Sequence, residues 1–218
     1  MPIYVYAYIM KTIVLHTPKG GSGKSTLARE LAVALDAIGE TVAIADLDPQ
    51  GTTRGWYGRR KAESPVVIGQ DAISKAADAG VTFLIVDTPP GHMQSPKPSE
   101  TPLIASLISS ADLVLVPVRP TPDDLLGAAP IANTLAKLKP AKWAFVLSQV
   151  PPRSRFTFPA VRQLAALGMV APEQIGFRAD YPAASIDGTA AVEFSGKASK
   201  EVKQLVKYVI ASVSDNNE

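Results

Sequence analysis

Short apolar runs recur along the chain at intervals that suit the strands of a buried sheet. They are rich in Val, Ile and Leu and have few polar interruptions, which is typical of parallel strands covered on both faces. The runs lie at Ile13–Leu15, Thr41–Ala45, Phe83–Val86, Leu113–Val118 and Trp143–Leu147, and a further short strand is predicted at Gln174–Phe177.

Between these runs the apolar residues follow the helical period. The clearest helix has a face made by Leu27, Leu31, Leu35 and Ile38, and Gly39 predicts its end. Further helices are predicted at Asp71–Ala79, 124–138, Phe158–Leu167 and Lys197–Val213, with 52–63 as an exposed segment or helix and the proline-rich Ser95–Pro102 as a connection. Strands that alternate with helices imply right-handed crossovers. We therefore expect an α/β fold, with a mainly parallel twisted sheet flanked by helices on both faces.

Composition limits the class of protein. A chain of 218 residues with 46% hydrophobic residues suits one α/β domain over 1–218, and it has no apolar stretch long enough to span a membrane. The absence of cysteine excludes disulfides and cysteine-ligated iron–sulfur clusters, and it suits a cytoplasmic protein.

The first residues, 1–9, carry no chemistry. The segment has neither the basic start nor the cleavage site of a signal peptide. It could be an extra edge strand, a remnant of expression or an upstream start, and we expect it to be peripheral to a domain that begins near Met10.

One segment combines glycines, a lysine and hydroxyl residues between a predicted strand and a predicted helix. It reads Lys19, Gly20, Gly21, Ser22, Gly23, Lys24, Ser25, Thr26. Glycines allow backbone N–H groups to turn inward around an anion, and the helix N-terminus adds partial positive charge. Lys24 would reach the β- and γ-phosphates of a nucleotide, and the Ser25 hydroxyl would bind Mg²⁺.

This loop has Pro18 where the common pattern has a glycine, and it has a second cation, Lys19. The form Lys-Gly-Gly-x-Gly-Lys-Ser/Thr resembles the deviant Walker A loop of the ParA/MinD family of ATPases, and most closely that of short ParA-type plasmid partition ATPases. The resemblance covers about residues 11–210. It implies a P-loop NTPase fold that binds and hydrolyses ATP with Mg²⁺. It also implies a dimer in which Lys19 reaches the partner subunit's nucleotide.

Three acids follow predicted strands. The spacing of Asp46 and Asp48 puts both on one side of the strand's carboxyl end, where open parallel sheets bind ligands. Asp87 ends the next apolar strand and is suited to support bound Mg²⁺. By resemblance, Asp48 would orient the attacking water and Asp46 would support the Mg²⁺ ligands.

The resemblance continues through two later segments, Val116–Leu125 and Val150–Arg153. In the segment Val116–Leu125, Asp124 matches the family's acid that contacts the signature lysine. Ser148 stands where the family often has an asparagine that helps to read adenine, so adenine recognition by that route is not expected here.

Basic residues gather in one part of the chain although the net charge is only +2. Residues 141–179 contain Lys142, Arg153, Arg155, Arg162 and Arg178 against a single acid, Glu173. Such a cluster suits contact with the DNA backbone without base reading, although scattered basic residues usually form a solvated face. By resemblance, Arg153, Arg155, Arg162 and Arg178 would bind DNA non-specifically from the dimer.

The main functional hypothesis is therefore an ATP-driven DNA-segregation protein, which would act on the nucleoid in the cytoplasm. A centromere-binding adaptor protein would stimulate hydrolysis and release the dimer from DNA. The motif starts at Lys19, so we expect no preceding helix-turn-helix reader.

The alternatives are a MinD-like membrane positioner and a positioner of protein organelles or conjugation machinery. The closing helix has an apolar face, but the polar, acidic tail after it argues against membrane binding. A metabolic kinase or synthetase would leave Lys19 without a purpose.

Overall fold

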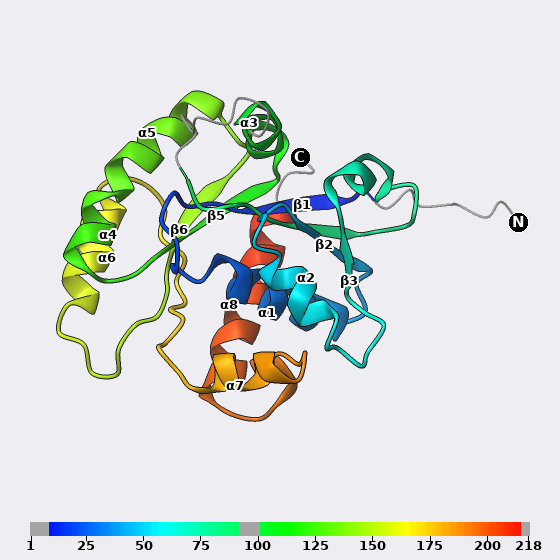
Figure 1. Cartoon of the computed structure of the whole chain (residues 1–218). Coiled ribbons are helices and arrows are strands. Elements are labelled where there is room, and N and C mark those ends of the chain that lie inside the picture. The colour runs from blue at the N-terminus through cyan, green and yellow to red at the C-terminus, as the bar shows by residue number, and fades with distance from the viewer. Residues whose placement is uncertain (1–8, 92–100, 215–218) are drawn as a thin grey trace, which may run out of the picture.

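The computed structural model describes residues 9–91 and 101–214, and its centre is a six-stranded parallel sheet (Figure 1). The strands lie in the order β3-β2-β4-β1-β5-β6, and every pair is parallel. Their bounds are β1 Lys11–Leu15, β2 Val42–Asp46, β3 Val66–Ile68, β4 Phe83–Asp87, β5 Leu113–Val118 and β6 Trp143–Leu147. The predicted α/β fold is confirmed.

Helices cover both faces of this sheet (Figure 1). Alternate residues of each strand point to opposite faces, so the sheet has one cluster of buried apolar side chains on each face. Ile13 and Leu15 of β1 pack in the cluster with α1 and α8, and Val14 packs in the cluster with α3, α5 and α6. The helices are α1 Lys24–Asp36, α2 Thr52–Tyr57, α3 Thr101–Ser110, α4 Pro122–Leu126, α5 Ala128–Leu138, α6 Thr157–Ala165, α7 Asp180–Ile186 and α8 Lys197–Ser214, with 3₁₀ turns η1 Gln70–Lys75 and η2 Ala191–Glu193.

The strand prediction fails at two places. Gln174–Phe177 forms no strand, because only Gly176 makes a single bridge, to Val150. The short strand β3 was not predicted, since its three residues lie at the sheet edge and are partly exposed. The expected peripheral role of 1–9 falls almost entirely outside the described residues.

Several helix boundaries also differ from prediction. α1 ends at Asp36, and Ile38 lies beyond it with 59% of its surface exposed, so Ile38 does not belong to the apolar face. Asp71–Ala79 gives only the 3₁₀ turn η1. The segment 124–138 divides at Gly127, because Pro130 has no N–H to continue the backbone ladder across that point. The described end of Ser95–Pro102 already begins α3.

Trp56 shows that α2 is a core element rather than an exposed segment. Its ring is 0% exposed, and its Nε1 donates a hydrogen bond to the Thr189 carbonyl at 2.8 Å. The Arg60 guanidinium lies 5.2 Å from the ring centroid and pairs with Glu193 at 3.1 Å. These contacts hold α2, which follows the Asp46–Asp48 segment, against the chain before and within η2.

Glu30 is a buried acid that joins α1 to η2. Its two oxygens accept the backbone N–H groups of Ala191 at 2.8 Å and Val192 at 2.9 Å. Burial raises the pKa of Glu30 to about 7, although these hydrogen bonds oppose the rise. The folded protein therefore binds this proton more tightly than the unfolded chain does.

We expect Glu30 to make the free energy of unfolding fall as pH rises from about 4.5 to about 7, by up to about 3 kcal/mol. Below this window both states are protonated, and above it both are ionised. Urea unfolding of Glu30→Gln at several pH values should show this slope reduced, while the exposed Glu63→Gln should keep it. An unchanged slope in Glu30→Gln would contradict the assignment.

Candidate nucleotide-binding site

The loop between β1 and α1 has the backbone of an anion-binding turn. Gly21 and Gly23 have φ values of +72° and +97°, which favour glycine because a Cβ is strained in this region. Gly23 stands at the N-cap of α1, so the first N–H groups of the helix face the loop. The sequence places Lys24 and Ser25 in the first turn, directly behind these groups.

Lys24 is folded into this loop with only 6% of its surface exposed. Its Nζ donates hydrogen bonds to the carbonyl oxygens of Thr17 at 3.3 Å and Lys19 at 3.4 Å. Burial lowers the pKa of Lys24, and the charges of Asp87 and Asp48 oppose this. The result is a desolvated cation inside an anion-binding turn, which is the group that a phosphate chain needs.

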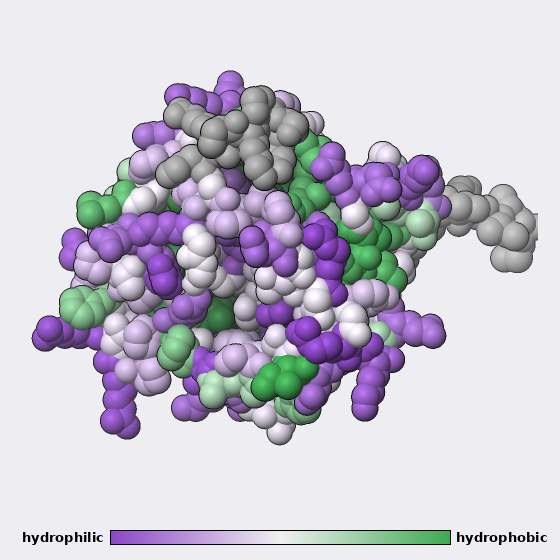
Figure 2. Space-filling view, in the orientation of Figure 1, coloured by the Kyte–Doolittle hydropathy of each residue, from purple (hydrophilic) through white to green (hydrophobic). Residues whose placement is uncertain are grey.

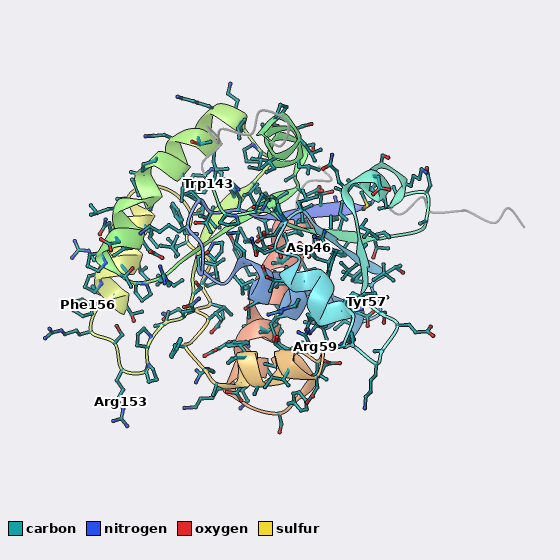
Figure 3. All side chains as sticks on the ribbon, in the orientation of Figure 1. Asp46, Tyr57, Arg59, Trp143, Arg153 and Phe156 are labelled. Carbon is teal, nitrogen blue, oxygen red and sulfur yellow. The ribbon has the colours of Figure 1, made fainter. Side chains whose placement is uncertain are left out.

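The predicted acids meet at the carboxyl edge of the sheet. Asp46 and Asp87 are register partners on β2 and β4 (Asp46 is labelled in Figure 3). The two oxygens of Asp46 accept the backbone N–H groups of Asp48 at 3.1 Å and Arg54 at 2.8 Å. Asp48 accepts the Gln50 N–H at 2.9 Å. Asp46 thus anchors the turn that presents Asp48.

Asp87 is 0% exposed and has one oxygen without a hydrogen-bond partner among the described residues. Its other oxygen accepts the Thr53 hydroxyl at 2.8 Å. Burial raises the pKa of Asp87 to about 6, although the Ser25 hydroxyl, which lies nearby without a hydrogen bond of ordinary length, the Thr53 hydroxyl and the charge of Lys24 oppose the rise. A buried carboxylate oxygen without a hydrogen-bond partner is expected where a cation, or a water bound to the cation, would lie.

These residues fit Mg²⁺ of the kind that nucleotides carry. Within 9–91 and 101–214 no group of three or more His, Cys, Asp or Glu residues could hold a metal ion alone. Mg²⁺ commonly uses one or two protein ligands together with phosphate oxygens. The Ser25 hydroxyl would hold the ion, with Asp87 and Asp46 beside it, and the ion would neutralise phosphate charge.

The second loop cation is engaged within its own chain. Lys19 Nζ lies 3.0 Å from Asp124 Oδ1, and Arg119 Nε lies 2.8 Å from Asp124 Oδ2. Burial alone would raise the pKa of Asp124, but the hydrogen bonds from Arg119 and Lys19 outweigh it and lower the pKa to about 2. Arg119 was not singled out from the sequence, where nothing indicated that it shares this acid.

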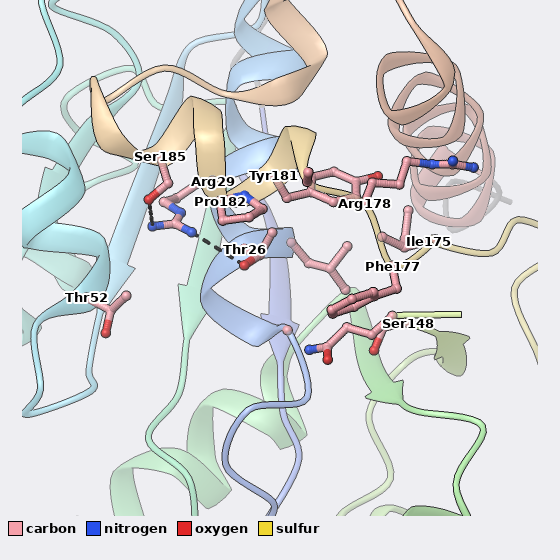
Figure 4. Close-up of a pocket in the computed structure, with 15 residues that line it drawn as sticks. Thr26, Arg29, Thr52, Ser148, Ile175, Phe177, Arg178, Tyr181, Pro182 and Ser185 are labelled. Atoms are coloured by element: carbon pink, nitrogen blue, oxygen red, sulfur yellow. Dashed lines mark hydrogen bonds between the residues drawn. The ribbon is translucent and has the colours of Figure 1, made fainter. Parts of the chain in front are cut away.

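A cavity of about 560 Å³ opens beside the start of α1 (Figure 4). Its lining includes Gly23, Thr26, Arg29, Gln149, Phe177 and Tyr181, and no Asp or Glu. This space lies next to the phosphate-binding turn and has the size and mixed character of a small-molecule site. It was not predicted, because its walls come from α1, α2, α7 and loops far apart in the sequence.

Ser148 and Gln149, which directly follow β6, hold the phosphate-binding turn in place. Ser148 Oγ donates to the Ser22 carbonyl at 2.5 Å, and Gln149 Nε2 donates to the Gly21 carbonyl at 2.6 Å. The only hydroxyl proton of Ser148 is therefore directed at the loop and not at the cavity.

The basic residues fall into two groups. Arg153, Arg155 and Arg162 are exposed on the loop before α6 and on α6 itself. Arg153 and Phe156 lie at the outer edge in Figure 3, and Figure 2 shows hydrophilic side chains projecting at the same corner. Arg178 does not join them, because it binds Glu201 on α8 through Nε at 2.9 Å and through a second contact from Nη2.

Comparison with known proteins agrees with this geometry. Residues 13–213 match the CobQ/CobB/MinD/ParA nucleotide binding domain family. Maintenance of carboxysome distribution protein A (McdA) of Halothiobacillus neapolitanus is 28% identical over 217 residues, which cover 92% of this chain and 97% of that protein.

The chromosome-partitioning ATPase Soj of Thermus thermophilus is also 28% identical, over 60% of this chain and 63% of its own length. The crystal structure of the cell division ATPase MinD from Pyrococcus furiosus superposes with a TM-score of 0.74 at 18% identity, covering 93% of this chain and 99% of that one. Because the family match spans nearly the whole sheet and the phosphate-binding turn, this chain belongs to the CobQ/CobB/MinD/ParA nucleotide-binding family.

Proposed function

We propose that this protein is an Mg²⁺-dependent ATPase that converts ATP and water to ADP and phosphate and uses the cycle to position a cargo. The observation that carries the proposal is the second loop cation, Lys19, held 3.0 Å from Asp124 beside the turn that buries Lys24. One bound triphosphate has its cation in Lys24. Lys19 is therefore proposed to exchange Asp124 for a nucleotide in a partner subunit when two subunits pair.

Each site residue has a role in this proposal. Lys24 and the N–H groups of the loop hold the β- and γ-phosphates, and Ser25, with Asp46 and Asp87, serves Mg²⁺. Asp48 orients the attacking water. Two ATP-bound subunits form a homodimer in which Lys19 leaves Asp124, and Arg119 keeps that acid paired when it does.

The dimer is proposed to use DNA as its track. Arg153, Arg155 and Arg162 are exposed near one another in sequence and have no ion pair among the described residues. Pairing two subunits doubles the phosphate contacts that one particle can make, so DNA binding would depend on ATP. The protein would then associate with the nucleoid.

Two cargoes fit this cycle. In DNA partition, a centromere-binding adaptor protein stimulates hydrolysis and the cargo is a plasmid or chromosome. Positioning of a protein organelle is the second candidate, and it is supported by similarity to McdA over 92% of this chain. Deleting the gene in its host separates them. Partition predicts loss of DNA at division, whereas organelle positioning predicts clustered assemblies with normal DNA inheritance.

Membrane positioning is less well supported. The apolar residues Val202, Leu205, Val206 and Val209 of α8 are buried in the core with α1 and are not free for a bilayer. No helix in the described part of the chain is both long and apolar enough to cross a membrane.

We expect DNA binding to require ATP and to weaken steeply with salt. The slope of log affinity against log salt should be about 0.9 per neutralised phosphate. The double reversal Arg153→Glu with Arg155→Glu should lower affinity for unrelated duplexes alike and leave ATP binding unchanged. Gel shifts at two salt concentrations, with and without ATP, measure this.

The matched control reverses Lys75 and Lys137, which are exposed on other elements. Loss of DNA affinity in both double variants would indicate that the net charge of the protein, and not the surface around Arg153 and Arg155, controls DNA binding. No binding by the wild-type protein in either nucleotide state at low salt would remove DNA as the track.

A further inference from the structure

Arg29 is a buried cation that faces the cavity beside the phosphate-binding turn. It lies on α1, one turn after Ser25 and Thr26, and only 8% of its surface is exposed. Figure 4 shows its guanidinium between α1 and α7. It reaches the Ser185 hydroxyl through Nη1 and the Thr26 hydroxyl through Nη2, both at 3.4 Å.

These contacts use two of the five N–H donors of the guanidinium, and both hydrogen bonds are long. A distance of 3.4 Å is at the outer limit for a hydrogen bond, and a guanidinium has five donors. Among the described residues no carboxylate lies within ion-pair distance of Arg29, and the oxygens of its neighbour Glu30 are taken by Ala191 and Val192. The Arg29 guanidinium also lies 5.9 Å from the centroid of the Trp56 ring.

The charge balance of the cavity indicates an anionic ligand. Burial lowers the pKa of Arg29, which reflects the cost of keeping this charge away from water, although the charges of Glu30, Asp87 and Asp46 oppose the shift. The cavity walls contain no acid, and the other cation among them, Arg178, is bound to Glu201. Arg29 is therefore the cation that a negatively charged group entering the cavity from the phosphate-binding turn would meet.

We propose that Arg29 is a nucleotide-binding residue whose guanidinium binds the α-phosphate, together with the Thr26 hydroxyl. The inference rests on the proposed function. Thr26 and Arg29 are three residues apart on one helix, so they share a face, and Thr26 follows the turn that would hold the outer phosphates. The α-phosphate is the group that connects those phosphates to a nucleoside in the cavity. The planar fork of arginine suits two phosphate oxygens at once.

The alternative is that Arg29 only ties α1 to α7. Arg59 provides a matched control, because its Nη2 donates to the carbonyl of the same Ser185 at 3.1 Å. Arg59 is exposed and does not line the cavity. Both substitutions, Arg29→Met and Arg59→Met, therefore remove a tie to α7, but only the first removes a cation from the cavity.

Equilibrium titration of wild-type protein, Arg29→Met and Arg59→Met with ATP, ADP and adenosine tests the inference. We expect Arg29→Met to lower the affinity for ATP and for ADP by the same factor, about 10- to 100-fold, because both nucleotides carry the α-phosphate. Adenosine binding should be unchanged, and Arg59→Met should bind all three as the wild type does. Thermal unfolding reports separately on the tie to α7.

Several outcomes would overturn the inference. Wild-type affinity in folded Arg29→Met leaves only the structural role, and an equal loss for adenosine places Arg29 at the nucleoside. A larger loss for ATP than for ADP places it at the γ-phosphate. If Arg29→Met does not fold, Arg29→Lys is used instead, because it keeps the positive charge but lacks the planar guanidinium. Wild-type affinity for ATP and ADP in Arg29→Lys would contradict the binding of two phosphate oxygens by Arg29. If the wild-type protein itself binds neither nucleotide, the proposed function fails first.

Discussion

Lys24→Ala is expected to abolish productive ATP binding. The variant removes a desolvated ammonium that is 6% exposed and enclosed by the carbonyls of Thr17 and Lys19. Loss of one partner from a buried charged contact costs about 2–5 kcal/mol, which corresponds to about 30- to 4,000-fold in Kd. Equilibrium titration with a fluorescent ATP analogue measures the change.

The control for this variant is Lys137→Ala, which removes an exposed lysine of α5. It should bind ATP as the wild type does. Thermal unfolding must show that Lys24→Ala remains folded. Wild-type-like affinity in that folded variant would remove the assignment of the turn as a phosphate-binding loop.

Asp48→Ala is expected to bind ATP but to turn it over slowly. Asp48 lies after β2 at the carboxyl edge of the sheet, and its charge acts on the pKa of Lys24 across the site. A group that orients the water acts mainly in the transition state, so the loss should fall on kcat, by about 100- to 10,000-fold. The variant should accumulate as an ATP-bound dimer, which light scattering detects alongside phosphate release.

Asp48→Asn separates charge from local structure in this experiment. Its side-chain oxygen can still accept the Gln50 N–H, so the turn is kept while the charge is lost. We expect Asp48→Asn to be as slow as Asp48→Ala, and the exposed Asp78→Ala to turn over normally. An unchanged rate in either Asp48 variant would rule this residue out as the water-orienting acid.

The secondary structure with strong local patterns was predictable. The runs that became β1, β2, β4, β5 and β6 are apolar on both faces, and a helix covers each face, so burial alone identifies them. Predictions failed where local preference was weak. β3 gains its pairing from β2, and Ile38 is apolar in sequence but lies past the end of α1.

The site divides in the same way. The sequence predicted a glycine-rich turn and two acids at one edge of the sheet, and both are present, because a turn and strand ends each form from neighbouring residues. The roles of Asp46, Asp87 and the loop lysines stay predictions. The exposure of Arg153 and the pairing of Arg178 with Glu201 could not be predicted from the sequence, because the position of a basic residue in the chain does not reveal its partner in space. Arg119 and Arg29 gave no sequence signal for the same reason.

The sequence by itself therefore determined the α/β fold, the phosphate-binding turn and the resemblance to its family, since each depends on residues close together in the chain. Tertiary structure alone decided the cavity, the sharing of Asp124 by Lys19 and Arg119, and the burial of Arg29 among hydroxyls. These features join residues up to 156 positions apart, as Arg29 and Ser185 are. Their charges and distances exist only once the sheet and its helices have packed, because desolvation and pairing depend on what lies nearby in space.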